Sequence, residues 1–266
     1  MGFSRAVTDD FLTRFGGIAR LYGISALEKF SHSHVMIIGL GGVGSWVVEA
    51  LARSGVGTFS LVDLDELCQT NVNRQIHALT QTVGQSKTTA LAERVDAINP
   101  EATLIEHHCF YSEKNANVIL TEKRPNLVID AIDSSRSKIH LLATCRHLGI
   151  PVITSGAAGG KTDATKVQID DLSRVHGDSL LNGVRRQLRG RYRFPQATKK
   201  GGKFGIPAVF SPEERLFPQC DGSTSTDRPE NHTGGIRCDA GYGAATHLTA
   251  TFGNLAAGWA LQQLAE

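Results

Sequence analysis

A glycine cluster near the start of the chain has the spacing of a nucleotide-binding turn. Gly39, Gly41 and Gly44 form G-x-G-x-x-G between an apolar run, 35–39, and a helical pattern that begins at Gly44. Glycines at this spacing let the backbone turn tightly and approach a phosphate closely. The turn suits NAD as well as other nucleotides, so residues further along the chain must decide between them.

Charged and amide residues follow the second predicted strand, 58–63. Asp63 ends that strand, about 20 residues beyond the glycines, where dinucleotide-binding folds place an acidic residue on the ribose. Ribose binding does not explain the stretch that comes next, because an arginine and several carboxamides suit phosphate oxygens instead. The residues of this stretch are Asp65, Asn71, Asn73, Arg74 and Gln75.

Two further charged residues stand at the ends of predicted elements. Lys87 opens a helix predicted over 85–98, where its charge adds to the attraction of the helix dipole for an anion. Asp133 follows a strand predicted over 127–131, at the sheet edge where a carboxylate can hold Mg²⁺ against phosphates. Each residue alone also fits a helix cap or a solvated face. Together, in this order, they indicate a site for a nucleoside triphosphate.

The elements that position these residues alternate between strand and helix. Strands are predicted over 35–39, 58–63, 103–108, 127–131, 151–154 and 164–169, and helices over 8–30 (two short ones), 44–54, 85–98, 115–120, 135–148 and 243–264. Alternation of this kind is typical of an α/β fold with a Rossmann-like, doubly wound, mostly parallel sheet. We expect that sheet to be followed by a long, basic, irregular insertion and a C-terminal helix.

Composition excludes several other classes. The chain has 266 residues, 41% of them hydrophobic, and a net charge of +2, which by itself does not indicate a nucleic-acid partner. Its five cysteines form no C-x-x-C pair, so we expect no disulfide framework, no zinc and a reducing, cytoplasmic location. No signal-peptide pattern opens the chain. The apolar window 244–264 could be mistaken for a membrane span, but its polar residues favour a buried helix.

The run GLGGVG, followed by DLD, NVNRQ, VGQSK and DAIDS, resembles the adenylating superfamily of ubiquitin-activating enzymes and their bacterial relatives in molybdopterin and thiamine biosynthesis. The resemblance implies that the chain binds ATP and activates a carboxylate as an acyl-adenylate, with release of pyrophosphate. Catalytic roles are implied for Arg74, Lys87 and Asp133, with Asp133 on Mg²⁺. The implied ATP-binding residues are Gly39, Gly41, Gly42, Gly44, Asp63, Asp65, Asn71, Arg74, Gln75 and Lys87.

Further stretches, among them RFGGIARLYG, NRQIHAL, SGAAGG and CDAGYGAATHLTATFG, are similar to one branch of that superfamily, which dehydrates threonylcarbamoyladenosine in tRNA. This resemblance implies adenylation of the threonine carboxylate and attack on it from within the same modification. It also implies a homodimer in which Arg14 or Arg20 acts on the site of the other copy. Whether a monovalent cation binds near SGAAGG stays open.

A basic stretch supplies a place for tRNA. No acidic residue occurs over 179–212, and the basic residues there are interleaved with Tyr192 and Phe194. Such a stretch suits phosphate contacts and stacking on an unpaired base, although a solvated basic loop has the same composition. We expect tRNA and no DNA as a partner. The predicted tRNA-binding residues are Arg185, Arg186, Arg189, Arg191, Arg193, Lys199 and Lys200.

Three parts of the chain are therefore expected. Residues 1–172 form an ATP-binding adenylating domain, 173–235 a basic, partly flexible segment for tRNA, and 236–266 a C-terminal helical segment that packs on the core.

Two other functions stay open at this point. One is an adenylyltransferase or sulfur acceptor that serves a ubiquitin-like carrier or a cysteine-desulfurase system, with Cys238 or Cys220 as its thiol. An intramolecular cyclisation needs no thiol, because its nucleophile is already tethered. The other is an NAD-dependent dehydrogenase, which would leave the N-x-x-R-Q cluster unexplained.

Overall fold

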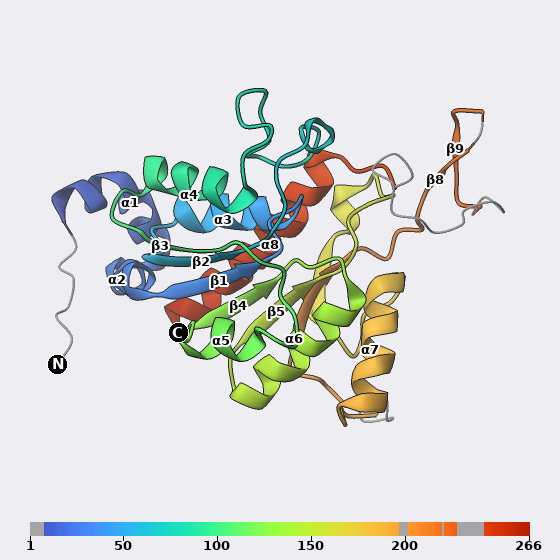
Figure 1. The fold of residues 1–266 in the computed structure, drawn as a ribbon. Helices are drawn as coiled ribbons and strands as arrows, with labels where there is room; N and C mark the ends of the chain where they lie inside the picture. Colours follow the sequence, from blue (N-terminus) through green and yellow to red (C-terminus); the bar gives the residue numbers. More distant parts are fainter. Residues whose placement is uncertain (1–7, 197–201, 220, 228–241) are drawn as a thin grey trace.

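A seven-stranded sheet forms the centre of the molecule (Figure 1). The computed structural model describes residues 8–196, 202–219, 221–227 and 242–266. The strand order is β3-β2-β1-β4-β5-β7-β6, and every neighbouring pair is parallel except β6 and β7. The strands are β1 (His34–Ile38), β2 (Thr58–Val62), β3 (Thr103–His107), β4 (Leu127–Asp130), β5 (Val152–Ser155), β6 (Gln168–Asp171) and β7 (Pro207–Phe210), and a separate pair joins β8 (Phe217–Pro218) to β9 (Thr224–Ser225).

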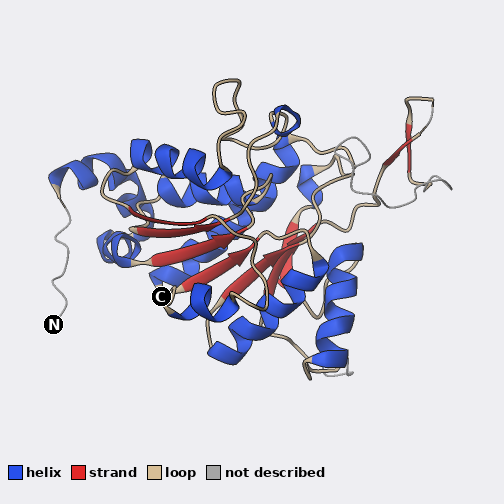
Figure 2. Cartoon of the chain, in the orientation of Figure 1, coloured by secondary structure: helices blue, strands red, loops and turns tan. Residues whose placement is uncertain are grey.

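Helices cover both faces of this sheet (Figure 2). One hydrophobic core lies between the sheet and α2, α3, α4 and α8, and a second lies between the opposite face and α5, α6 and α7. Strands β1 and β4 are almost entirely buried because helices cover both faces of the sheet, and their residues are therefore mostly apolar. The helices are α1 (Asp9–Tyr22), α2 (Ile24–His32), α3 (Gly44–Ala52), α4 (Lys87–Ile98), α5 (Ala116–Thr121), α6 (Ser135–Leu148), α7 (Ser179–Arg191) and α8 (Thr246–Ala265).

The order of the strands reverses between β1 and β4. From β1 the chain proceeds to β2 and β3 on one side, whereas β4 and β5 lie on the other. Gly39 follows β1 and Ala131 follows β4, so both lie at the carboxyl ends of adjacent strands. In doubly wound sheets, ligands bind in the crevice at such a switch point. The fold therefore brings the glycine turn and the Asp133 loop to one edge.

The predicted α/β fold is confirmed, but the expectation of an irregular 173–235 segment is wrong in two places. Residues 179–191 form α7, and 207–210 form β7, which inserts between β5 and β6. The helix is hard to recognise because its buried stripe has only three residues among glycines and arginines: Leu181, Val184 and Leu188. Strand β7 is short, and its partners lie far away in the sequence. The strand predicted over 164–169 also starts later, because residues 164–166 form a 3-10 turn.

The C-terminal helix α8 packs along α3, as the polar residues in its apolar window suggested. Close approach depends on Gly253, where an added Cβ would lie 2.7 Å from Trp46 Cβ and 2.8 Å from the Val43 carbonyl oxygen. Among the described residues, no helix has the length and apolar character that crossing a membrane requires.

Gly253→Ala should lower the free energy of unfolding by about 1–3 kcal/mol, because α8 must move away from α3 to fit the methyl group. Gly258 lies on the same helix with open space around its Cα, and Gly258→Ala should instead stabilise the protein by about 0.5–1 kcal/mol. Urea denaturation of the two variants measures both changes. Equal effects in the two variants would contradict the close packing of α8 on α3.

Candidate functional site

The glycines of the turn differ in their surroundings: three of them are closely packed and one faces open space. Gly39 has a φ of 90°, and an added Cβ would lie 2.7 Å from the Ala131 carbonyl oxygen; at Gly44 it would lie 1.9 Å from the Gly39 oxygen. At Gly42 an added Cβ would meet Thr249 Cγ2 at 2.9 Å. A Cβ on Gly41 would meet nothing within 4 Å. Gly41 is therefore the position at which a ligand can come directly against the backbone.

Asp63 ties this turn to the end of β2. Its Oδ2 accepts a hydrogen bond from the Leu40 backbone N–H at 2.7 Å, and its Oδ1 accepts one from the Asp65 N–H at 2.9 Å. The side chain is buried, with 7% of the residue exposed. A carboxylate oxygen can accept more than one hydrogen bond, so Asp63 can still accept hydrogen bonds from ribose hydroxyls.

Lys87 joins the same network from α4. Its Nζ lies 2.6 Å from Asp65 Oδ2, and its backbone N–H donates to the Asp65 carbonyl at 3.0 Å. The lysine side chain is 8% exposed and the aspartate side chain 51% exposed. A chain of hydrogen bonds thus connects Leu40, Asp63, Asp65 and Lys87. The ammonium group is held in place at the crossover between β2 and α4.

Arg74 is positioned by contacts to its backbone from two helices. Trp46 Nε1 on α3 and Thr249 Oγ1 on α8 both donate to the Arg74 carbonyl oxygen, at 3.1 and 3.2 Å. Asn73 is held in a similar way, since its Nδ2 donates to the Ala244 carbonyl and its own carbonyl accepts from Thr246. The crossover 63–86, in teal, therefore rises beside the start of α8 (Figure 1). An added Cβ on Gly42 would lie 3.4 Å from Arg74 Cγ, so the arginine stem lies over the glycine turn.

The two predicted amide ligands are buried, and they differ in their partners. The Asn71 Oδ1 accepts from the Cys68 N–H at 3.1 Å, which closes the turn before Arg74. Gln75 is 5% exposed, and its Oε1 has no hydrogen-bond partner among the described residues. Asn71 therefore serves its own loop, whereas Gln75 retains an acceptor atom without a partner.

Asp133 lies exposed in the loop after β4, next to a buried ion pair. Lys138 Nζ on α6 lies 2.8 Å from Asp130 Oδ2, and Thr154 Oγ1 donates to the same oxygen at 2.7 Å. Both charged side chains are fully buried. The other oxygen, Asp130 Oδ1, accepts from the Ile132 N–H at 3.1 Å, so the pair holds the backbone that leads to Asp133.

Asp133 is the one predicted protein ligand for a magnesium ion. Within the described ranges, no group of three or more histidine, cysteine, aspartate or glutamate residues could hold a metal ion. A single carboxylate suits Mg²⁺ when phosphates and water supply the other ligands. Near SGAAGG the protein supplies an ammonium group of its own. The buried Lys161 Nζ lies 3.8 Å from Asp178 Oδ2. A monovalent cation there stays a prediction.

The remaining predicted residues lie elsewhere. Arg14 pairs with Asp10 on α1, which packs through Phe11 and Phe15 near Gly55, beyond the carboxyl end of α3. Arg14 and Arg20 are thus remote from the glycine turn of their own chain. On and after α7, Arg186, Arg191 and Arg193 are exposed, whereas Arg185 and Arg189 donate to backbone carbonyls. Lys199, Lys200, Cys220 and Cys238 lie outside the described residues.

Sequence reasoning missed the residues that hold the site together. Lys138, Asp130 and Thr154 lie inside predicted elements and make contact only in the folded sheet. Thr249 and Trp46 hold Arg74 from helices far away in the sequence. One indication of such contacts was present in the sequence, namely the polar residues in the apolar window 244–264, which include Thr249.

The sequence pattern of the ThiF family matches residues 17–265. The chain belongs to the ThiF family. A tRNA threonylcarbamoyladenosine dehydratase from Haemophilus influenzae is 46% identical over 256 residues, which cover 96% of this chain and 95% of the relative. The resemblance to the adenylating superfamily and to this branch of it is confirmed.

Solved structures are similar over nearly the whole chain. The Escherichia coli tRNA N6-threonylcarbamoyladenosine dehydratase in complex with ATP has a TM-score of 0.85 at 40% identity, and covers 97% of this chain and 96% of its own. The same enzyme in complex with AMP has a TM-score of 0.86 at 40% identity, with 98% of each chain covered. This ThiF-family chain thus has the fold of proteins crystallised with ATP and with AMP.

His77 is buried, and the positive charges of Lys87 and Arg94 act on it. Only 2% of the residue is exposed, and neither ring nitrogen has a hydrogen-bond partner among the described residues. Burial lowers the pKa of His77 to about 3, and the positive charges of Lys87 and Arg94 add to the decrease. The imidazole is therefore neutral in the folded protein at neutral pH.

His77→Gln should flatten the pH dependence of stability. Between its ordinary pKa of 6.5 and about 3, the unfolded chain binds a proton at His77 that the folded chain does not. The free energy of unfolding therefore falls as pH falls through this range, by at most about 1.4 kcal/mol per pH unit from this group. Urea denaturation across the range compares the variant with wild type and with the exposed His147→Gln. The same slope in all three proteins would contradict the burial of a neutral His77.

Lys138→Met should destabilise the chain by about 3–5 kcal/mol, because Asp130 would remain as an unpaired buried charge. Adding Asp130→Leu should recover most of that loss, since an apolar pair of similar volume tolerates burial better than a lone charge. Denaturation midpoints of the single and double variants measure the coupling. Additive losses would show that the two side chains do not act as a pair.

Proposed function

We propose that this chain catalyses the ATP-dependent dehydration of N6-threonylcarbamoyladenosine in tRNA, beside the anticodon. The threonine carboxylate attacks the α-phosphate of ATP, which forms an acyl-adenylate and releases pyrophosphate. The carbamoyl group of the same nucleoside then attacks the activated carbonyl, which expels AMP and closes a ring with net loss of water. Tethering makes the second step intramolecular and raises its effective concentration.

The observation that carries this proposal is the hydrogen-bonded chain from the glycine turn to Lys87. It holds an ammonium near the turn at which Gly41 is open to a ligand, while Arg74 lies over Gly42. Negative charge builds on the phosphates as the carboxylate attacks, and cations fixed in advance stabilise it without reorganising. The ATP and AMP complexes of the similar E. coli enzyme support the binding of an adenine nucleotide.

Each residue has a defined task in this proposal. Asp63 orients the ribose, and Lys87, Arg74 and Gln75 bind phosphate oxygens. Asp133 would hold Mg²⁺ against the phosphates, where the ion would neutralise part of their charge. Asp65 holds the Lys87 ammonium at 2.6 Å and so limits its movement.

We also propose that the chain acts as a homodimer. Arg14 and Arg20 lie on α1, remote from the glycine turn of their own chain, so a role in catalysis requires a second copy. The division into 1–172, 173–235 and 236–266 stays a proposal, and the packing of α8 against α3 supports the last of these parts. A cysteine-desulfurase partner would be needed only if Cys238 or Cys220 carried sulfur.

Lys87→Ala should lower the rate of pyrophosphate release about 10²–10³-fold, because a fixed cation is lost from the site of charge development. The assay supplies ATP with tRNA that carries threonylcarbamoyladenosine, and mass spectrometry follows the loss of water from the nucleoside. The exposed Lys166→Ala should retain the wild-type rate.

Substrate controls decide between functions. Release with unmodified tRNA, or with a Gly-Gly-tailed carrier protein in place of tRNA, would contradict the proposal, and the second result would support the sulfur-carrier alternative. Cys238→Ser should leave the cyclisation unchanged.

A further inference from the structure

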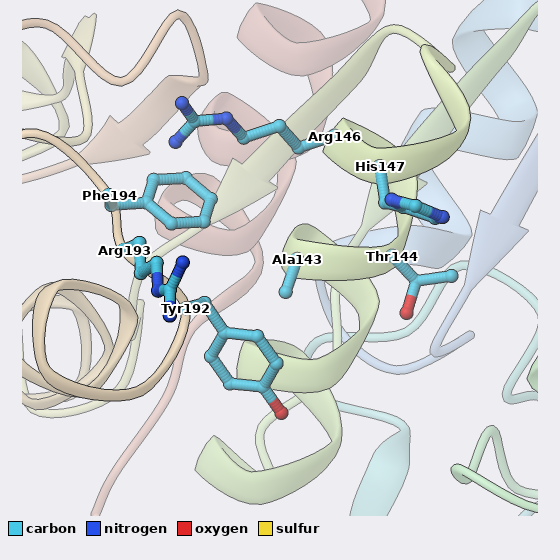
Figure 3. Close-up of a pocket in the computed structure, with 7 residues that line it drawn as sticks. All are labelled: Ala143, Thr144, Arg146, His147, Tyr192, Arg193 and Phe194. Carbon is cyan, nitrogen blue, oxygen red and sulfur yellow. The ribbon is translucent and has the colours of Figure 1, made fainter.

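A pocket lies between α6 and the segment that follows α7, away from the glycine turn. Its volume is about 630 Å³, which is in the range of pockets that bind one small ligand. Figure 3 shows side chains of α6 on one side and of residues 192–194 on the other. The lining residues are Ala143, Thr144, Arg146, His147, Tyr192, Arg193 and Phe194. None of them is acidic.

The pocket presents an arginine fixed in one plane. The Arg146 guanidinium carbon lies 4.2 Å from the centroid of the Phe194 ring. Phe194 is itself buried and packs against Phe204 at 4.9 Å between ring centroids. Arg146 is exposed, so one face of its guanidinium rests on an aromatic ring while the side chain faces solvent. Fixed guanidinium planes and exposed aromatic rings are the surfaces on which unpaired bases stack.

Arg193 stands in a conformation that favours glycine. Its φ is 54°, and it alone among the described non-glycine residues has a positive φ. It directly follows the last turn of α7, where the Tyr192 and Phe194 N–H groups both donate to the Leu188 carbonyl. Glycine is usual at this position after a helix, because a Cβ is disfavoured there. An arginine here costs stability, so its guanidinium is expected to have a use.

We propose that this pocket binds a nucleotide of single-stranded RNA, with the base stacked against Arg146 and Tyr192 and the phosphate paired with Arg193. This inference rests on the proposed function, since it assigns the pocket to the tRNA substrate. Arg146 lies about 16 Å along α6 from Ser135, at 1.5 Å per residue. The pocket therefore holds a different nucleotide from the one that reacts near Asp133.

A second depression continues the basic surface along α7. It has a volume of about 690 Å³ and is lined by residues that include Arg185, Arg186 and Arg189. Arg185 and Arg189 donate to backbone carbonyls, which leaves the exposed Arg186 to contact a phosphate. None of the residues that line this depression is acidic, so its lining presents no carboxylate to an RNA backbone. RNA can thus run from the pocket along α7.

Binding of a labelled, unmodified anticodon stem-loop to the full-length chain, without ATP, tests the pocket. Arg193→Gly should raise the Kd about tenfold, reduce the salt dependence of binding by about one phosphate contact, and leave the thermal midpoint equal or higher. Tyr192→Ala should raise the Kd about 5- to 100-fold without changing the salt dependence, and Tyr192→Phe should restore affinity. Arg53→Ala, an exposed arginine on the other side of the sheet, should bind as wild type does.

Wild-type affinity in both Arg193→Gly and Tyr192→Ala would overturn the proposal. Displacement of the stem-loop by polyglutamate as readily as by single-stranded RNA of equal charge would also overturn it, and would assign the pocket to an acidic protein. The two proposals fail separately. A wild-type chain that binds the stem-loop through the pocket but releases no pyrophosphate with modified tRNA contradicts the proposed function alone.

Discussion

The Asp63 carboxylate is the contact on which the candidate site depends. With one oxygen it holds the backbone N–H of Leu40 in the glycine turn, and with the other it holds Asp65, the partner of Lys87. Turn, strand end and cation are thereby fixed relative to one another before any ligand arrives. Because both oxygens accept backbone hydrogen bonds, a neutral or shorter side chain could not replace it without freeing the turn.

A buried ion pair has a similar task on the other side of the switch point. Asp130 and Lys138 are fully buried, and burial of a pair contributes little to net stability because desolvation offsets the attraction. What the pair does provide is position, since Asp130 also accepts from Ile132, one residue before Asp133. The loop that leads to Asp133 is thus held by the buried Asp130–Lys138 pair, and fixing charged groups in advance is how a preorganised electrostatic site is built.

The correspondence between sequence and structure was closest where patterns are local. Strand β1, which precedes the glycine turn, is apolar after His34, and Asp63, Lys87 and Asp133 were predicted at element ends, where they lie. Helix α7 was missed because its buried stripe is narrow and its glycines and arginines resemble a loop. The sequence showed that the stretch is basic, but it could not show which arginines contact the protein itself. Arg189, for example, donates to the Pro195 carbonyl.

The sequence by itself determined the doubly wound fold, the order of the motifs and the membership of the adenylating superfamily, because strand periodicity and glycine spacing are properties of short segments. Only the tertiary structure decided that Asn71 bonds to its own loop, whereas the buried Gln75 Oε1 has no hydrogen-bond partner among the described residues. It also brought Arg146 onto Phe194, nearly fifty residues later in the chain. Hydrogen-bond partners and stacking depend on distances between segments, and those distances exist only once the sheet and its helices have packed.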